Sequence, residues 1–159
     1  MISISKKWLA LPLVCSISLL SACSSSMLTV PAISQSAQKT PGQVVWRDLI
    51  TTEPKQVQGF YQAVFDWSFE PINDYYSLIK YQGNYIAGMA SAPIGDDTNY
   101  WLPVMSTLDV DATVQLAKAA GAKVLVGKTT LNGRGDIAVI QDPQGAVFSV
   151  LDTVAGDPE

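Results

Sequence analysis

Two apolar stretches near the end of the chain are joined by a short polar turn. Ile137–Ile140 and Ala146–Leu151 flank the turn Asp142–Gly145, whose sequence is DPQG. Because proline pre-sets one turn dihedral angle and glycine supplies a positive one, this pattern favours a hairpin between buried strands. Earlier in the chain, Tyr76–Gln82 and Tyr85–Ala92 flank a Gln-Gly-Asn turn in the same way. The chain therefore contains two similar hairpins.

A strand and a helix precede the first hairpin. Val44–Ile50 predicts a strand, and the alternation of side chains along a strand places Trp46, Asp48 and Ile50 on one face and Val45, Arg47 and Leu49 on the other. Pro54 then opens a helix whose apolar side chains recur at helical spacing, namely Val57, Phe60, Tyr61, Val64 and Phe65. A short strand over Trp67–Pro71 leads into the hairpin.

The second hairpin is preceded by the same series of elements. Tyr100–Leu108 predicts a strand, and one of its faces carries Trp101, Pro103, Met105 and Thr107. Asp109 is a suitable cap for a helix over Ala112–Ala120, which Gly121 ends, and Lys123–Thr130 predicts the next strand. Both halves thus have the order strand, helix, strand, strand, strand. The sequence predicts an α/β fold of the α+β type, built from two βαβββ modules that share one core.

The beginning of the chain has the form of an export signal. Lys6 and Lys7 precede an apolar run, Trp8–Leu20, which is too short and too rich in serine to span a membrane comfortably. The residues that follow, Leu-Ser-Ala-Cys, resemble the lipobox of bacterial lipoproteins, in which the cysteine becomes the lipid-modified first residue. A standard secretory signal with an incidental Cys23 is the alternative.

The resemblance to a lipobox implies a lipid anchor on Cys23 and therefore a membrane as a partner. Ser24 stands where the inner-membrane retention signal has aspartate, which favours the bacterial outer membrane with the domain facing the periplasm. Residues 24–42 are rich in Ser, Thr, Gln and Pro, without apolar periodicity. We expect a signal peptide at 1–22, a flexible tether at 23–42 and one domain at 43–154.

Composition and charge exclude several classes of function. Removal of residues 1–22 takes two of the ten basic residues and leaves eight against 14 acidic ones, a net charge near −6. Without a cluster of Lys and Arg, nucleic acid is not an expected partner. The chain has no histidine, which excludes mechanisms that need imidazole. Cys15 leaves with the signal and Cys23 carries lipid, so the exported domain has neither a disulfide nor a nucleophilic thiol.

The two halves contain six short motifs in a fixed order: Phe60-Tyr61 with Asp66-Trp67, Tyr85–Met89, Tyr100-Trp101, Asp109–Ala112, Gly133-Arg134 and Asp142–Phe148. With these motifs in this order, the sequence resembles the vicinal oxygen chelate superfamily. That superfamily includes glyoxalase I, extradiol dioxygenases and bleomycin- or fosfomycin-resistance proteins. The resemblance implies that each module curls its strands into half a barrel, whose concave face forms a ligand cleft. Related folds often form homodimers, but a chain with both halves does not need a partner to complete its cleft.

The resemblance also bears on cofactors. Members of the superfamily usually hold a divalent metal with His, Glu or Gln on cleft-facing strands. The corresponding positions here fall near Trp46, Ala87, Trp101 and Ser149, none of which is a suitable ligand for a first-row metal. We therefore expect no metal site and no cofactor.

Four residues are the leading candidates for the site. Trp46 and Trp101 occupy similar strand positions, so we expect them to face each other across the cleft and to stack a planar ligand, or else to fill the cleft as core. Asp48 is the best placed carboxylate for acid–base catalysis, with a salt bridge to Arg134 or a capping role as the alternative. Arg134 could bind an anionic group at the mouth of the cleft, or pair structurally. Tyr76, Met105 and Ser149 are expected to line the cleft or to belong to the core.

Three functions remain open. The first is a metal-independent lipoprotein that binds a small apolar or aromatic molecule, and the resemblance to bleomycin-resistance proteins implies that it sequesters this ligand. The second is a lyase or isomerase that uses Asp48 as a base. The third is a non-catalytic envelope-interaction module whose cleft is closed by tryptophan. An open cleft would argue against the third function, and a carboxylate with a raised pKa inside it would favour the enzyme.

Overall fold

The computed structural model describes residues 38–92 and 99–158. The predicted signal peptide, most of the tether and the lipidation site Cys23 lie outside these residues. No helix in the described ranges is long and apolar enough to cross a membrane. The strands are β1 (Val44–Thr51), β2 (Ser68–Pro71), β3 (Tyr76–Tyr81), β4 (Asn84–Ser91), β5 (Tyr100–Ser106), β6 (Lys123–Leu131), β7 (Gly135–Gln141) and β8 (Val147–Thr153), and the helices are α1 (Pro54–Phe65) and α2 (Val110–Ala119).

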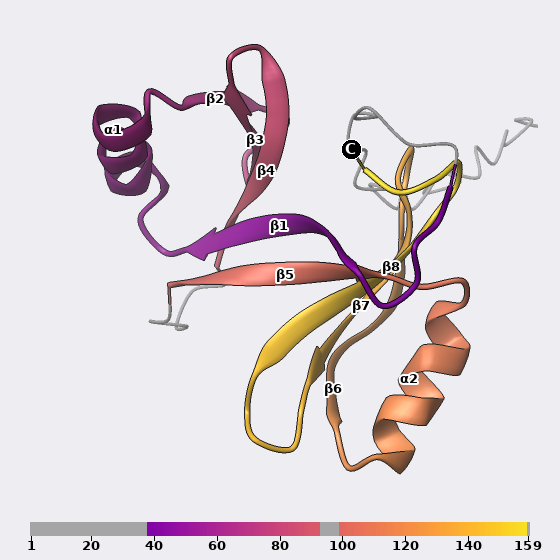
Figure 1. Ribbon diagram of the computed structural model, residues 1–159. Helices are drawn as coiled ribbons and strands as arrows, with labels where there is room; N and C mark the ends of the chain where they lie inside the picture. Colours follow the sequence, from indigo (N-terminus) through magenta and orange to yellow (C-terminus); the bar gives the residue numbers. More distant parts are fainter. Residues whose placement is uncertain (1–37, 93–98, 159) are drawn as a thin grey trace, which may run out of the picture.

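The elements follow the order strand, helix, strand, strand, strand twice, which confirms the predicted fold class. The predicted ends of the elements differ from the observed ones by two residues at most. All eight strands form one sheet in the order β2-β3-β4-β1-β5-β8-β7-β6. The two halves meet at its centre, where β1 and β5 run antiparallel side by side (Figure 1). Within each half the first and last strands, β1 with β4 and β5 with β8, pair in parallel.

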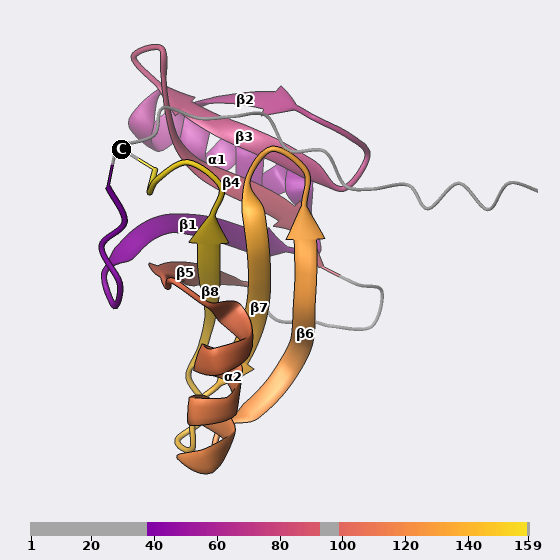
Figure 2. The same cartoon turned by 90° about the vertical axis from the view of Figure 1, so that its right-hand side faces the viewer.

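Each helix packs on one face of its half of the sheet, and neither helix covers the opposite face. Figure 2 shows α2 alongside β6, β7 and β8, whereas α1 lies near β2 to β4. Side chains under α2 form one core cluster, with Val110, Val114, Ala138, Ile140 and Val150. Those under α1 form another, with Leu49, Ile79, Ala87 and Met89. A third cluster, Trp46, Leu78, Val104 and Leu151, has the opposite parity along the strands. We call the face that carries this third cluster the inner face.

The two helices are buried to different extents. In α2 the Asp109 carboxylate caps the helix by accepting the Ala112 N–H at 2.9 Å, and Val110 and Val114 are buried. In α1 no residue is fully buried, and Phe60 is 58% exposed. The apolar stripe of α1 is therefore only partly buried. Its aromatic side chains instead pack mainly against each other and against Trp67 and Trp101.

Candidate functional site

A cavity of about 270 Å³ opens on the inner face, between the two halves of the sheet. Its lining comes from seven strands, β1 and β3 to β8, and from the segments before β3 and between β6 and β7, and we call it the inner cavity. The lining residues are Trp46, Asp48, Tyr75, Tyr76, Ala90, Ser91, Val104, Leu131, Arg134, Ile137 and Leu151. Most of these side chains are apolar or aromatic, and only Asp48 and Arg134 are charged.

Asp48 and Tyr76 form the polar centre of the inner cavity. The Tyr76 hydroxyl donates to Asp48 Oδ1 at 2.8 Å, and Trp46 Nε1 donates to the same oxygen at 3.2 Å. Burial raises the pKa of Asp48 above its ordinary value, although the Tyr76 hydrogen bond, the Arg134 charge and the Trp46 hydrogen bond each act in the opposite direction. Burial and the Asp48 charge raise the pKa of Tyr76 as well. Tyr76 therefore remains a protonated donor, and Asp48 keeps its proton to a higher pH than an ordinary aspartic acid does.

The polar pair fits only because residue 88 is glycine. Asp48 on β1 lies beside Gly88 on β4 in the parallel register. A Cβ atom on Gly88 would lie 2.0 Å from both Asp48 Oδ1 and the Tyr76 hydroxyl oxygen. Any side chain at this position would therefore displace the carboxylate or the phenol. The sequence contained a signal for this, since a glycine inside a strand pattern often marks a close approach.

Arg134 enters the inner cavity from the turn between β6 and β7. The backbone N–H of Arg134 donates to the Leu131 carbonyl at 3.0 Å, and its backbone carbonyl accepts the Val154 N–H at 3.2 Å. Glycines with positive φ angles precede and follow it, and a Cβ on Gly135 would lie 2.0 Å from the Asp152 carbonyl oxygen. This turn directs the side chain inward, because Arg134 is only 4% exposed. The expected position at an open cleft mouth is wrong: the residue is buried.

The guanidinium group of Arg134 lies over the ring of Trp46, with Cζ 4.9 Å from the ring centre. Its Nε and Nη2 atoms are buried and have no hydrogen-bond partner among residues 38–92 and 99–158. No ion pair joins Arg134 to Asp48 within the described residues, although the charge of Arg134 acts on the pKa of Asp48. The alternative reading of Asp48 as a salt-bridge partner of Arg134 is therefore not what the structure shows.

Trp101 does not face Trp46. In the β1–β5 register Trp46 lies opposite Val104, and Trp101 lies opposite Leu49. Opposed residues on neighbouring strands share a face, so Trp101 is on the helix-covered side. There it is 37% exposed and its Nε1 donates to the Tyr61 hydroxyl at 3.1 Å. The expected pair of tryptophans across a cleft is wrong.

The two remaining candidates lie outside the lining of the inner cavity. Met105 is paired with Val150, which packs under α2, so its side chain belongs to the helix-covered side. Ser149 pairs with Val104 and is on the inner face, but it is fully buried, and its hydroxyl donates to the Pro103 carbonyl at 3.4 Å. The inner cavity thus brings together Trp46, Asp48, Tyr76 and Arg134 and leaves out Trp101, Met105 and Ser149.

Comparison with known proteins gives relatives for most of the chain. "Putative glyoxylase CFP32" of Mycobacterium bovis is 32% identical over 114 residues, which cover 69% of this chain and 44% of that protein. "Anthracycline biosynthesis protein DauV" of a Streptomyces species is 28% identical over 130 residues, which cover 69% of this chain and 46% of that protein. The chain therefore spans less than half the length of these curated relatives. No protein-family model matches the chain.

Solved structures agree with these relatives. The Mn(II)-bound glyoxalase from Novosphingobium aromaticivorans superposes with a TM-score of 0.50 at 18% identity, over 80% of this chain and 42% of that one. A variant of homoprotocatechuate 2,3-dioxygenase from B. fuscum gives 0.54 at 14% identity, over 80% of this chain and 37% of that one. The chain has the glyoxalase-like, vicinal oxygen chelate fold.

The donors of a glyoxalase-like metal site are missing from the inner face. The structure corrects two of the expected ligand positions, because Ala87 packs under α1 and Trp101 lies on the helix side, so that Gly88 and Val104 face inward instead. Asp48 is the sole carboxylate of the inner cavity. No group of three or more His, Cys, Asp or Glu residues in the described ranges could hold a metal ion. The residues present do not fit the metal that the fold suggests.

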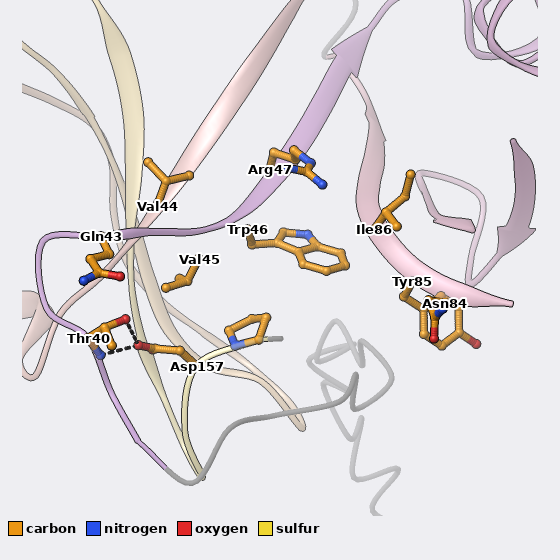
Figure 3. Close-up of a pocket in the computed structure, with 11 residues that line it drawn as sticks. Thr40, Gln43, Val44, Val45, Trp46, Arg47, Asn84, Tyr85, Ile86 and Asp157 are labelled. Carbon is orange, nitrogen blue, oxygen red and sulfur yellow. Dashed lines mark hydrogen bonds between the residues drawn. The ribbon is translucent and has the colours of Figure 1, made fainter. Parts of the chain in front are cut away.

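A second hollow, of about 470 Å³, lies on the other side of Trp46. Figure 3 shows the Trp46 indole pointing toward the space between Asp157 and Tyr85. The Asp157 carboxylate is fully occupied here: it accepts the backbone N–H and hydroxyl of Thr40 and, at 2.8 Å, the hydroxyl of Ser106. This hollow therefore combines a structural cluster with solvent-exposed walls, whereas the inner cavity holds the unpartnered donors.

Proposed function

We propose that this domain binds a small, largely apolar molecule in the inner cavity without a bound metal ion. The observation that carries the proposal is the cavity itself, which is apolar over most of its wall and has two charged groups at fixed positions. Ligand sites in proteins are mostly apolar with a few placed polar groups, and range from roughly 300 to 1,000 Å³. A cavity of about 270 Å³ suits a ligand with one ring or a short chain.

The inner cavity also bears on the other two functions. Space remains beside Trp46, which favours binding over an interaction module whose cleft is filled by tryptophan. Trp46 supplies an aromatic wall, and contacts between aromatic rings add roughly 0.5–1.5 kcal/mol beyond their buried area. The proposal extends to location: the signal sequence and Cys23 support a lipid-anchored domain that meets its ligand in the periplasm.

Binding is tested by filling the inner cavity. Ala90 is half-buried on its wall, so Ala90→Phe should occupy the ligand space with little effect on the core. Ala119→Phe, on the exposed end of α2, is the matched control. With indole as the probe and EDTA present, calorimetry should show binding to the wild type and to Ala119→Phe, and loss of binding in Ala90→Phe. Unchanged binding by a folded Ala90→Phe protein would overturn the proposal, and so would failure of the wild type to bind indole, phenylacetate and phenylacetamide alike.

Asp48 supports a second candidate, a lyase or isomerase in which it is the base. Its raised pKa is the supporting observation, since general bases work best with a pKa near the working pH. Both of its hydrogen bonds from described residues reach Oδ1, which leaves Oδ2 to accept a proton from a ligand. Deuterium exchange into a bound carbonyl compound, followed by NMR in D₂O and abolished by Asp48→Asn, would distinguish turnover from binding.

A further inference from the structure

We infer that the ligand of the inner cavity carries a carboxylate, and that Arg134 binds it through the Nε–Nη2 edge of its guanidinium group. The inference rests on the proposed binding function and names the chemical class of the ligand. It starts from a buried cation, Arg134, two of whose donors have no partner among residues 38–92 and 99–158.

The donors in question have a defined geometry. Nε and Nη2 of Arg134 are buried and lack hydrogen-bond partners within the described residues. These two atoms share one edge of the planar guanidinium, where their N–H bonds point the same way. That edge matches the two oxygens of a carboxylate in a bidentate pair. A buried charged donor without an acceptor costs free energy. A ligand that supplies both acceptors removes this cost, and the removal favours binding.

No described residue accepts a hydrogen bond from this edge, which is buried in the unliganded protein. Trp46 covers one face of the guanidinium and does not compete for its N–H groups. Asp48 already accepts two hydrogen bonds from Tyr76 and Trp46, and forms no ion pair with Arg134 in the part of the chain that the structure describes. Asp136, the nearest acidic residue in sequence, and Asp152, which is paired with it on β8, lie beside Lys128 and Lys39 instead.

The remaining wall specifies the body of the ligand. Val104, Ile137 and Leu151 form an aliphatic surface, and Tyr75 adds an aromatic side chain. Arg134 is the only cation in this lining, and Asp48 would oppose a second negative charge. A monoanion with two in-plane oxygens and an apolar body fits these conditions, whereas a phosphate dianion does not. The expected ligand class is therefore a small aryl or alkyl carboxylate.

The test compares molecules that differ only in the charged group. Phenylacetate and phenylacetamide have the same ring and nearly the same shape, and calorimetry measures the ratio of their affinities. In the wild type, phenylacetate should bind at least about tenfold more tightly, since hydrogen bonds to charged groups contribute roughly 1.5–3 kcal/mol. Arg134→Met should abolish this preference, and Arg134→Lys should reduce it because lysine cannot form the bidentate pair. Arg47→Met, at an exposed position on β1, is the control and should keep it.

Each outcome has a distinct meaning. Equal binding of the acid and the amide would overturn the carboxylate inference and leave the binding function intact. Failure of both probes and of indole to bind the wild type would overturn the binding function as well. A folded Arg134→Met protein that still prefers the acid would show that another group binds the anion. Competition by inorganic phosphate as strong as that by phenylacetate would overturn the assignment to carboxylates.

Discussion

Gly88 decides whether the polar centre of the inner cavity can form. It stands where a Cβ atom would overlap both the Asp48 carboxylate and the Tyr76 hydroxyl. We expect Gly88→Ala to lower the free energy of unfolding by about 1–3 kcal/mol, the usual range for overpacking, and to abolish ligand binding. Urea denaturation measures the first effect. Gly59→Ala is the control, because nothing lies within 4 Å of the added carbon in α1, and it should stabilise by about 0.5–1 kcal/mol.

The raised pKa of Asp48 predicts how stability changes with pH. A carboxyl group whose folded pKa lies above its ordinary value of 3.8 binds its proton more tightly in the folded state. The contribution of Asp48 to the free energy of unfolding is therefore fully present below pH 3.8 and is lost as the pH rises through the folded pKa. Asp48→Asn cannot ionise, so its stability relative to the wild type should improve progressively as the pH is raised above about 4.

Urea unfolding at a series of pH values measures this difference. Asp74→Asn, at an exposed position before β3, provides the matched control and should follow the wild-type profile. A constant difference between Asp48→Asn and the wild type from acid to neutral pH would contradict the prediction.

The two helices begin in different ways, which allows a test of the capping interaction. Asp109 accepts an N–H of the first turn of α2, whereas Glu53 makes no side-chain hydrogen bond at the start of α1. Asp109→Ala should therefore lower the free energy of unfolding by about 1 kcal/mol, and Glu53→Ala should leave it nearly unchanged. Thermal and urea denaturation of the two variants check the contrast. Equal losses would mean that the Asp109 hydrogen bond does not stabilise α2.

The order of the strands and helices could be predicted because it depends on local signals. The Asp142–Gly145 turn, Pro54 and Asp109 mark ends of elements in the sequence itself, and the structure has elements close to each predicted bound. It was harder to predict which face of the sheet each side chain occupies. A register shift of one residue transfers every side chain to the opposite face, and the β1–β5 register that sends Trp101 to the helix side depends on long-range pairing.

The same argument explains which parts of the site were missed. Alternation within a single strand is enough to place Trp46, Asp48 and Tyr76, and all three line the inner cavity. Alternation alone does not show which residues of a distant strand share their face. The burial of Arg134 was not predictable, since the direction of its side chain depends on the positive φ angles of Gly133 and Gly135 beside it and on a long-range backbone hydrogen bond with Val154. Gly88 is visible in the sequence as a glycine inside a strand, but the reason for it can be seen only from the positions of Asp48 and Tyr76 in the structure.

Attachment of the whole protein to a membrane is tested at Cys23. The basic residues, the apolar run and the Leu-Ser-Ala-Cys sequence predict a lipid-modified cysteine. Cys23→Ala should release the protein from the membrane fraction or leave it unprocessed, as judged by fractionation and mass spectrometry. Ser26→Ala, in the serine run after the cysteine, should change neither result. A Cys23→Ala protein that is still mature, acylated and bound to the outer membrane would contradict the prediction.

The cluster around Asp157 joins the two ends of the described domain. The Asp157 N–H donates to the Gln38 carbonyl at 3.0 Å, and its carboxylate binds Thr40. Figure 2 shows the last described residues beside the first ones. Because these ends adjoin, the chain can be closed there by a short Gly/Ser linker and opened at the exposed turn after Tyr81. Such a circular permutant should keep a cooperative unfolding transition and the inner cavity, so that the order of connection along the backbone can be changed while the arrangement of strands is kept.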